Sequence, residues 1–457
     1  MRCVVGIDLG STTTKSVLLD EDRRILGRGI TNSRSDYDVA CAVAREEALT
    51  SARFTLLERA VEHADEEGGP RHLLDPLREA FRLELFLEEL AALRERIAEL
   101  LAEESMAPWR DALEPAAQET LDGIEAQAPS FFVVGAARRS DFFRDLAGAG
   151  FMAGAQDLAT RGDVPFERLV ALYDRAILDV ETTLRPRAFS LLLRRATQRV
   201  VRRDAAGDAQ AQGLRRAVDE VLGQPIEELA FVGTGYGRQT LPFPREAIRS
   251  EILCHGRGSH FFFPQTRTVL DIGGQDTKAI QVTDGGVVST FQMNDRCAAG
   301  CGRYLGYIAD ELNLGLHELG PLALTARKVA KVNSTCTVFA GAELRERLAL
   351  GERREDVLAG LHRAMMLRAM SLLARSGGIE DELTFTGGVC KNDMATRVLR
   401  DLVADNYGAG ITINVHPDSI YMGAMGAALF ALDNLDAGRA LSPLRPQRAA
   451  EPAMEAC

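Results

Sequence analysis

The chain has 457 residues, a length sufficient for two or three domains that each bury a hydrophobic core. Its composition of 46% hydrophobic and 26% charged residues is that of an ordinary globular protein and excludes bulk disorder. The net charge of −12 argues against nucleic acid as a partner, because phosphate backbones bind basic surfaces. An arginine-rich stretch, Arg185 to Arg203, has helical spacing and acidic flanks, so it predicts a solvated helix face.

The start of the chain enters a strand pattern at once, without the charged and apolar leader of a secretory signal. No uninterrupted apolar stretch has the length of a membrane helix. We therefore expect a cytoplasmic protein without a membrane partner. Thiols stay reduced in that compartment, so the cysteines are expected to be core residues or metal ligands and not disulfides. The chain has eight: Cys3, Cys41, Cys254, Cys297, Cys301, Cys336, Cys390 and Cys457.

One internal repeat organises the sequence. Residues 8–17 and 271–280 both read Asp-Leu/Ile-Gly-x-x-x-Thr-Lys-x-Val/Ile. Each copy follows a run of β-branched residues and precedes a polar turn, which predicts a β-hairpin with a tight glycine turn. A hairpin that occurs twice so far apart predicts two similarly built α/β halves with a cleft between them.

The stretch between the two copies differs from both. Residues 37–224 are rich in Ala, Leu, Glu and Arg at helical spacing, as in Leu83–Leu93 and Phe189–Leu193, and predict a mainly helical insertion. Within it the apolar run Phe131–Gly135 fits a strand among helices. The predicted boundaries are 1–36, 225–268 and 421–440 for the first half, 269–420 for the second half, and 441–457 for a tail.

The two hairpin turns have the chemistry of a phosphate clamp. Turns made of Gly, Ser and Thr expose backbone N–H groups and hydroxyls to phosphate oxygens. Asp8 and Asp271 precede the turns and would face the same point, where carboxylates suit Mg²⁺. Lys15 and Lys278 are candidates for neutralising phosphate charge. The duplication weakens the alternative, two ordinary hairpins whose glycines serve only the turn. The candidate phosphate ligands are Gly10, Ser11, Thr12, Thr13, Gly273 and Gly274.

A third glycine element, Thr386–Asn392, follows a predicted strand and precedes a predicted helix. The backbone of Gly387 and Gly388 can approach a purine there, next to the positive end of the helix dipole. With the two phosphate hairpins it resembles the actin-like ATPase superfamily of sugar kinases, acetate kinase and heat-shock chaperones. That resemblance implies an α/β fold of two ribonuclease-H-like domains around a nucleotide cleft. Asp8, Asp271 and the Gly387–Gly388 turn would be its phosphate 1, phosphate 2 and adenosine motifs.

Two cysteines occupy similar local contexts. Cys297 follows Asn294-Asp295-Arg296, Cys336 follows Asn333-Ser334-Thr335, and each comes shortly before a predicted helix. The helix dipole stabilises a thiolate there, which suits an iron–sulfur cluster. Two cysteines cannot ligate a four-cysteine cluster alone, but an interface between two chains would supply four. Cys301 is a further candidate ligand, and two ordinary buried thiols are the alternative.

These cysteine segments, with the glycine motifs in the same order, resemble one specific family. They are similar to the activator ATPases of 2-hydroxyacyl-CoA dehydratases and the ATPase subunits of benzoyl-CoA reductase, the BadF/BadG/BcrA/BcrD-type ATPases. The resemblance covers residues 1–35 and about 225–435. The segment Thr31–Asp38 and the helical insertion resemble the larger ATPase subunit of benzoyl-CoA reductase. One departure is Cys301, where the family has a small hydroxyl residue.

The resemblance implies an ATP-hydrolysing subunit of benzoyl-CoA reductase that uses ATP, Mg²⁺ and a [4Fe–4S] cluster. Cys297 and Cys336 would bind the cluster together with a smaller homologous ATPase subunit. Reduced ferredoxin would supply electrons, which would pass to the catalytic subunits that bind benzoyl-CoA. Asp8 and Asp271 would hold the Mg²⁺ nucleotide, and Gln275 is a candidate for positioning the attacking water.

Three alternatives remain open. The chain could be the activator ATPase of a 2-hydroxyacyl-CoA dehydratase, which uses the same ATPase and cluster. It could be a small-molecule kinase of the same fold, in which case the paired cysteines would have no role. It could also be a nucleotide-switched binding module, although the sequence shows no separate region for binding a substrate.

Overall fold

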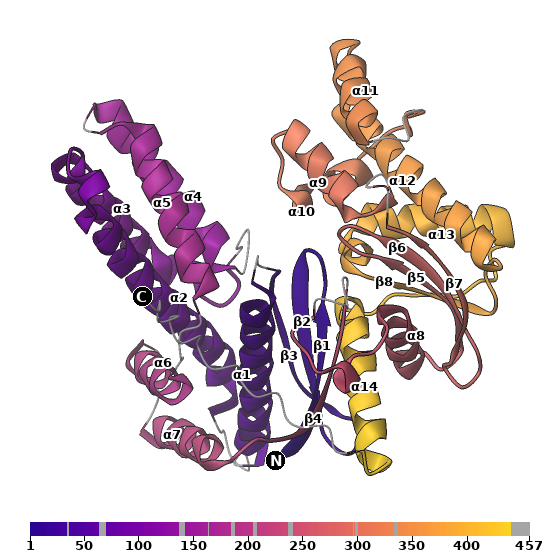
Figure 1. Cartoon of the computed structure of the whole chain (residues 1–457), viewed down its shortest axis with the longest axis horizontal. Helices are drawn as coiled ribbons and strands as arrows, with labels where there is room; N and C mark the ends of the chain where they lie inside the picture. Colours follow the sequence, from indigo (N-terminus) through magenta and orange to yellow (C-terminus); the bar gives the residue numbers. More distant parts are fainter. Residues whose placement is uncertain are drawn as a thin grey trace, which may run out of the picture. The chain divides into compact units, whose positions relative to one another are not determined.

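The computed structural model describes residues 1–33, 36–63, 70–136, 142–162, 164–183, 188–203, 208–235, 241–295, 297, 300–332 and 337–439. The chain divides into two compact units (Figure 1). One unit is Met1 with Arg34–Ile226, and the other combines Arg2–Ser33 with Glu227–Cys457. The long central stretch of the sequence is therefore an insertion between the first three strands and the rest of the second unit.

The first sheet of the second unit has four strands in the order β3-β2-β1-β4. Their bounds are β1 (Arg2–Leu9), β2 (Thr13–Leu19), β3 (Ile25–Asn32) and β4 (Glu227–Gly235). β1 is antiparallel to β2 and parallel to β4. Two helices, α8 (Glu251–Phe262) and α14 (Met422–Asp436), pack with this sheet. A Cβ on Gly6 of β1 would lie 2.0 Å from the Ala424 carbonyl oxygen, so the small residues of α14 allow a very close approach.

The second sheet repeats the pattern in the order β7-β6-β5-β8-β9. Its strands are β5 (Thr266–Ile272), β6 (Thr277–Val282), β7 (Val288–Asn294), β8 (Glu382–Thr386) and β9 (Ile413–Asn414). β5 is antiparallel to β6 and parallel to β8, as β1 is to β2 and β4. Both predicted hairpins, and the similar construction of the two halves, are confirmed.

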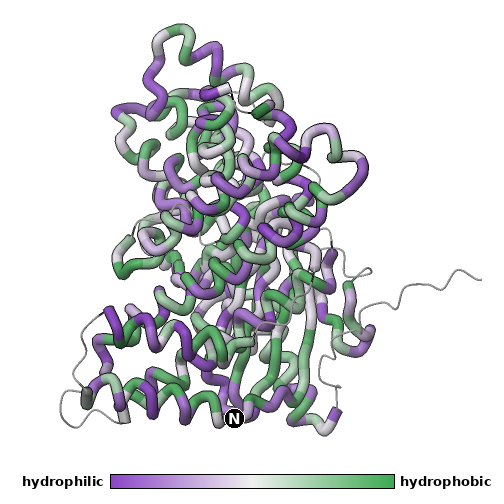
Figure 2. Tube along the Cα trace, turned by 90° about the vertical axis from the view of Figure 1, so that its left-hand side faces the viewer, coloured by the Kyte–Doolittle hydropathy of each residue, from purple (hydrophilic) through white to green (hydrophobic). Residues whose placement is uncertain are grey.

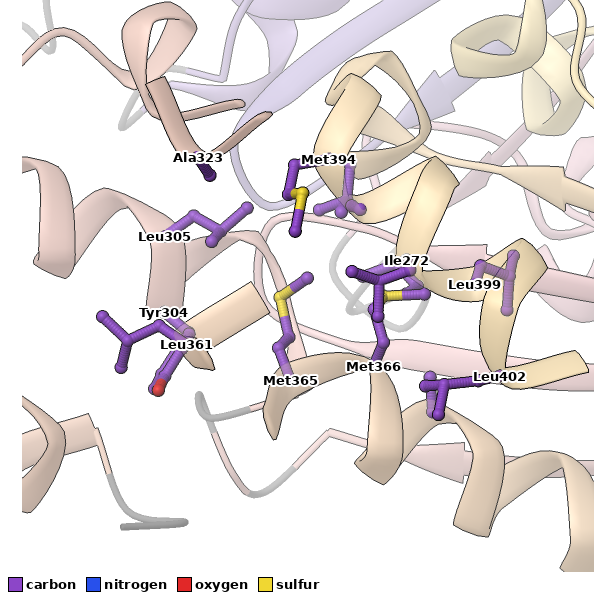
Figure 3. Packing of buried hydrophobic residues seen from close by; sticks show 14 of the residues in the cluster. Ile272, Tyr304, Leu305, Ala323, Leu361, Met365, Met366, Met394, Leu399 and Leu402 are labelled. Atoms are coloured by element: carbon purple, nitrogen blue, oxygen red, sulfur yellow. The ribbon is translucent and has the colours of Figure 1, made fainter. Parts of the chain in front are cut away.

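Helix α12 (Arg354–Ser376) lies in the main core of the second half. Its Met365 and Met366 lie among Leu305, Ile272 and Leu399 (Figure 3). By length and composition this helix could cross a membrane, yet 67% of its most apolar window is buried inside the protein. Packing in a protein core accounts for that composition. The other helical elements that the structure describes in this half are α9 (Gly302–Glu311), α10 (Leu316–Leu324), α11 (Thr337–Ala349), α13 (Asp393–Tyr407) and the short η5 (Gly388–Lys391) and η6 (Ser419–Tyr421). The short η3 (Arg245–Ala247) contacts β4 of the first half.

The insertion is mainly helical, as its spacing predicts. Along its helices hydrophilic and hydrophobic residues alternate, as expected for helices with one buried face (Figure 2). The long helix α2 contributes its first half to a core with α1, α6 and α7, and its second half to a core with α3, α4 and α5. The elements are α1 (Tyr37–His63), η1 (Pro70–Leu73), α2 (Leu74–Ala102), η2 (Glu104–Met106), α3 (Arg110–Phe131), α4 (Phe143–Arg161), α5 (Phe166–Thr182), α6 (Phe189–Arg203) and α7 (Asp208–Gly223).

The predicted strand at Phe131–Gly135 is wrong. Phe131 is the last residue of α3, and the following residues form a turn. Phe132 is buried there, with its ring centroid 5.5 Å from that of Phe86 on α2. A short apolar run has the same composition whether it forms a buried strand or a buried helix end, so periodicity could not separate the two.

Candidate nucleotide site and cysteine loop

Two aspartates lie buried at matching places on the two sheets. Asp8 of β1 is paired in register with Lys15 of β2, and Asp271 of β5 with Lys278 of β6. Both aspartates are 2% exposed. Lys15 Nζ lies 3.6 Å from Asp8 Oδ2, and Lys278 Nζ lies 3.3 Å from Asp271 Oδ2. Each half therefore supplies one buried acid with a lysine across the hairpin.

Side chains of helix α8 lie close to both aspartates. Its His255 is 4% exposed, and the imidazole Nδ1 lies 3.3 Å from Asp271 Oδ1. Ligand atoms of Asp8, Glu251 and His255 all lie within 4.8 Å of one another. Asp8 Oδ1 is buried and has no hydrogen-bond partner among the residues that the structure describes. A buried carboxylate oxygen is costly unless a cation or water satisfies it, so this arrangement fits a divalent cation.

Lys278 is enclosed at 1% exposure. Its Nζ lies 2.9 Å from Glu251 Oε1, 2.8 Å from Asp276 Oδ2 and 3.3 Å from Asp271 Oδ2. Burial by itself would lower the pKa of Lys278, but the three carboxylates outweigh burial and raise that pKa well above its usual value. The ammonium therefore stays charged and balances the surrounding acids.

Asp271 is held in its ionised form. Burial by itself would raise the pKa of Asp271. The charges of His255 and Lys278, with the hydrogen bond that Thr386 Oγ1 donates at 2.8 Å, outweigh burial and lower that pKa to about 2. Burial raises the pKa of the neighbouring Asp276. At neutral pH, Asp271 is thus a carboxylate that can accept hydrogen bonds from water or hold a cation.

The two hairpin turns face each other. A Cβ on Gly274 would lie 2.0 Å from Thr12 Oγ1 and 3.8 Å from Ser11 Oγ. Ser33 at the end of β3 donates a hydrogen bond to the Gly10 carbonyl and so supports the first turn. The structure thus brings together the predicted phosphate ligands Gly10, Ser11, Thr12, Thr13, Gly273 and Gly274, with Gln275 half-buried in the second turn.

The third glycine element lies beside Asp271. Gly387 has a φ of 86°, and a Cβ there would lie 2.3 Å from the Ile272 carbonyl oxygen and 3.0 Å from Asp271 Oδ1. Only glycine combines that backbone conformation with so close an approach. A Cβ on Gly388 would meet nothing within 4 Å. The turn therefore has one glycine packed against β5 and one facing open space, where a ligand can approach.

Cys297 lies in the loop between β7 and α9 and is half-buried. Its carbonyl accepts a hydrogen bond from Asn294 Nδ2 at 3.2 Å, and its Sγ accepts one from Arg368 Nη1 at 3.2 Å. Helix α9 begins at Gly302, so Cys301 and not Cys297 occupies the N-cap position. Burial raises the pKa of the Cys301 thiol, which keeps it protonated. Cys336, the other predicted ligand, lies outside the described residues.

The second hairpin turn and the cysteine loop are hydrogen-bonded to each other. The backbone N–H groups of Gly302 and Arg303 donate to the carbonyls of Gly273 and Gly274, both at 2.8 Å. Thr277 Oγ1 donates to the Gly300 carbonyl at 2.5 Å. The first turn of α9 is therefore held against the predicted phosphate-binding turn.

Sequence reasoning missed several residues of this site: Glu251, His255, Asp276 and Arg368. Glu251 and His255 lie four positions apart on a helix with many buried residues, and that pairing was the only available signal. A separate hollow of about 530 Å³ lies in the insertion. It is lined by Glu84, Arg195, Gln198, Arg199, Arg202 and Arg203, so it contains part of the arginine-rich helix face and none of the predicted nucleotide or cysteine residues.

Residues 5–431 match the model of the BadF/BadG/BcrA/BcrD ATPase family. The chain is 40% identical to the (R)-2-hydroxyglutaryl-CoA dehydratase activating ATPase of Acidaminococcus fermentans over 223 residues, which are 48% of this chain and 83% of that protein. It is 31% identical to a benzoyl-CoA reductase subunit from Thauera aromatica over 211 residues, 46% of this chain and 74% of that subunit.

Two solved structures share the fold. The (R)-2-hydroxyglutaryl-CoA dehydratase component from Acidaminococcus fermentans has a TM-score of 0.53 at 21% identity, covering 95% of this chain and 100% of that one. The activator of 2-hydroxyisocaproyl-CoA dehydratase from Clostridium difficile, with bound ADPNP, has a TM-score of 0.50 at 20% identity, covering 97% and 99%. With the duplicated sheets, these similarities identify the α/β fold of the actin-like ATPases.

The relatives also bear on the predicted subtype. At 40% against 31% identity, the dehydratase activator is a better match than the reductase subunit, so the comparisons favour the alternative function over the benzoyl-CoA reductase prediction. The insertion, which had favoured the reductase, does not decide between them. These observations establish the family: the chain belongs to the BadF/BadG/BcrA/BcrD ATPases.

Proposed function

We propose that this chain is the ATP-hydrolysing activator of a 2-hydroxyacyl-CoA dehydratase. One observation carries the proposal. The turn that faces Thr12 and follows the ionised Asp271 is hydrogen-bonded, through Gly302 and Arg303, to the segment that contains Cys297. A nucleotide site and a cysteine loop built on one hydrogen-bonded segment fit an ATPase that controls a redox centre.

ATP binds, in this proposal, with Mg²⁺ at Asp8 and Asp271. Asp8 Oδ1 is available to the cation or to its waters, since it has no hydrogen-bond partner among the described residues. The backbone and hydroxyl groups of the two turns bind the phosphates, and Gly387–Gly388 lies at the adenosine. ADPNP bound to the Clostridium difficile activator supports a nucleotide in a chain of this fold.

The two lysines have different roles in this arrangement. Lys15 is half-buried, and a Cβ on Gly10 would lie 2.9 Å from its Nζ, so the ammonium is next to the first turn and can reach a phosphate oxygen. Lys278 is held by three carboxylates and balances their charge instead. Gln275, half-buried in the second turn, positions the water that attacks the γ-phosphate.

Cys297 and Cys336 of two ATPase chains together supply four thiolates to a [4Fe–4S] cluster. Such a cluster supplies one-electron transfer at low potential. Cys297 fits this use because its thiol is half-buried and its sulfur already accepts a hydrogen bond from a cation. The proposed partners are a second ATPase chain, the catalytic component of the dehydratase, and reduced ferredoxin as the electron donor.

The deciding experiment is anaerobic purification followed by iron and acid-labile sulfide assays, with ATP hydrolysis and dehydratase activation measured on the same sample. We expect about four irons per two chains and ATP-dependent activation of a 2-hydroxyacyl-CoA dehydratase. Cys297→Ala should lose the iron and retain nucleotide binding. An iron-free wild-type protein that phosphorylates a small molecule would instead make the chain a kinase.

The ATPase subunit of a benzoyl-CoA reductase is the second candidate. The 31% identity over 74% of the Thauera aromatica reductase subunit favours it. Supplying the same preparation with reductase catalytic subunits and benzoyl-CoA separates the two candidates. Ring reduction without dehydratase activation would assign the chain to the reductase.

A further inference from the structure

Arg368 lies against the predicted cluster ligand. Its Nη1 donates a hydrogen bond to Cys297 Sγ at 3.2 Å, and its side chain is half-buried. Its Cβ lies 3.9 Å from the place that a Cβ on Gly300 would occupy, so the base of the side chain passes beside the same loop. A guanidinium therefore approaches the sulfur from a different element, α12, than the one that carries the cysteine.

The backbone at Arg368 is held by the core. Its neighbours on α12, Met365, Met366 and Ala369, are at most 1% exposed and belong to the main hydrophobic cluster. Residues on a core helix move little, because repacking the core is costly. The Cys297 loop has another support, since α9 is hydrogen-bonded to the second hairpin turn. Cys297 itself packs against that cluster, and α9 contributes Tyr304 and Leu305 to it. The guanidinium and the sulfur are thus held against one core.

We propose that Arg368 is a positioning residue that orients the Cys297 thiolate and raises the reduction potential of the cluster. This inference rests on the proposed function. Reduction adds one negative charge to the cluster, so a nearby fixed cation stabilises the reduced state more than the oxidised state. N–H···S hydrogen bonds act in the same direction. Arg368 contributes both effects at once, because its donor is charged.

The test compares four full-length proteins, purified anaerobically: wild type, Arg368→Gln, Arg368→Lys and Arg375→Ala. Arg375 is an exposed residue of the same helix and serves as the matched control. For each protein we would measure the iron content, the EPR spectrum of the reduced cluster and its midpoint potential. The potential and the spectrum report on the cluster itself and not on turnover.

We expect Arg368→Gln to make the midpoint potential of the cluster more negative by at least about 59 mV. That shift corresponds to a tenfold change in the one-electron equilibrium constant. Arg368→Lys should shift it less, because the charge remains, and Arg375→Ala should equal wild type.

The outcomes separate this inference from the proposed function. A folded Arg368→Gln protein that loses its iron while Arg368→Lys retains it would support the positioning role. A fully loaded Arg368→Gln protein with the wild-type potential and spectrum would overturn the inference and leave the proposed function intact. A wild-type protein without iron would overturn both.

Discussion

The buried oxygen of Asp8 gives the most direct residue-scale test of the nucleotide site. Asp8→Asn keeps the shape of the side chain and removes the charge that the proposed Mg²⁺ needs. We expect ATP hydrolysis to fall roughly 100-fold, as for the loss of one preorganised electrostatic group. The measurement is the steady-state rate as a function of Mg²⁺ concentration.

Asp22→Asn is the matched control for that experiment. Asp22 is exposed in the turn after β2, with its Oδ2 3.3 Å from Arg24 Nη1. Its rate should equal that of wild type. An Asp8→Asn protein with the wild-type rate and Mg²⁺ dependence would remove Asp8 from the site.

The lowered pKa of Asp271 predicts a pH dependence of stability. The pKa falls from the usual 3.8 to about 2 in the folded protein, so the ionised carboxylate stabilises the fold fully above pH 4. That contribution is lost as the pH falls through about 2. The difference of nearly two pKa units corresponds to about 2 kcal/mol. Asp271→Asn removes the group that titrates. Between pH 5 and pH 2.5 the free energy of unfolding of wild type should therefore fall by about 2 kcal/mol more than that of Asp271→Asn.

Urea unfolding at several pH values checks this prediction, with Asp381→Asn as the control because Asp381 is exposed. Asp381→Asn should follow the wild-type curve. If Asp271→Asn and wild type lost stability in parallel over that range, the ionised carboxylate would not stabilise the fold.

At the scale of elements, the packing of α14 against β1 depends on one glycine. A Cβ on Gly6 would lie 2.0 Å from the Ala424 carbonyl oxygen and 2.4 Å from the Ala428 backbone nitrogen. Both are backbone atoms, which cannot relieve the clash by a change of side-chain rotamer. Gly6→Ala should therefore force the helix from the strand and destabilise the protein by about 2–4 kcal/mol. The measurement is the shift in the thermal or denaturant midpoint.

Gly123→Ala is the control, and it should change the stability in the opposite direction. Gly123 lies inside α3, and a Cβ there would meet nothing within 4 Å. Alanine has the higher helix propensity, so this change should stabilise the protein by up to about 1 kcal/mol. Equal midpoints for the two variants would contradict the close packing of α14 on β1.

At the scale of the whole molecule, the insertion has its own cores. Its two hydrophobic clusters are formed almost entirely by residues of α1 to α7. An excised fragment of residues 36–224 should therefore fold alone, with helical circular dichroism and a cooperative unfolding transition of about 5–15 kcal/mol. Leu93→Ala, at a buried position of α2, should lower that stability by about 2–5 kcal/mol. A fragment that unfolds without a cooperative transition would show that the insertion needs the rest of the chain.

The sequence by itself determined the two hairpins, the mainly helical insertion and the family. These features depend on local patterns: the Asp-x-Gly-x-x-x-Thr-Lys repeat is read from neighbouring residues, and amphipathic spacing is read along one helix. The pattern did not predict the secondary structure of Phe131–Gly135, because a short apolar run occurs both in strands and at helix ends. The insertion also did not identify the partner enzyme, since it lies outside the shared ATPase motifs.

Only the tertiary structure decided which groups surround the aspartates and the cysteine. His255 and Glu251 reach Asp271 and Lys278 because α8 packs beside both sheets, and Arg368 reaches Cys297 from a helix 71 positions later in the sequence. The Gly302 and Arg303 contacts with the second turn were also absent from the sequence pattern. The physical reason is that electrostatic and hydrogen-bond interactions act through space, and the distances between residues far apart in the chain are set by packing.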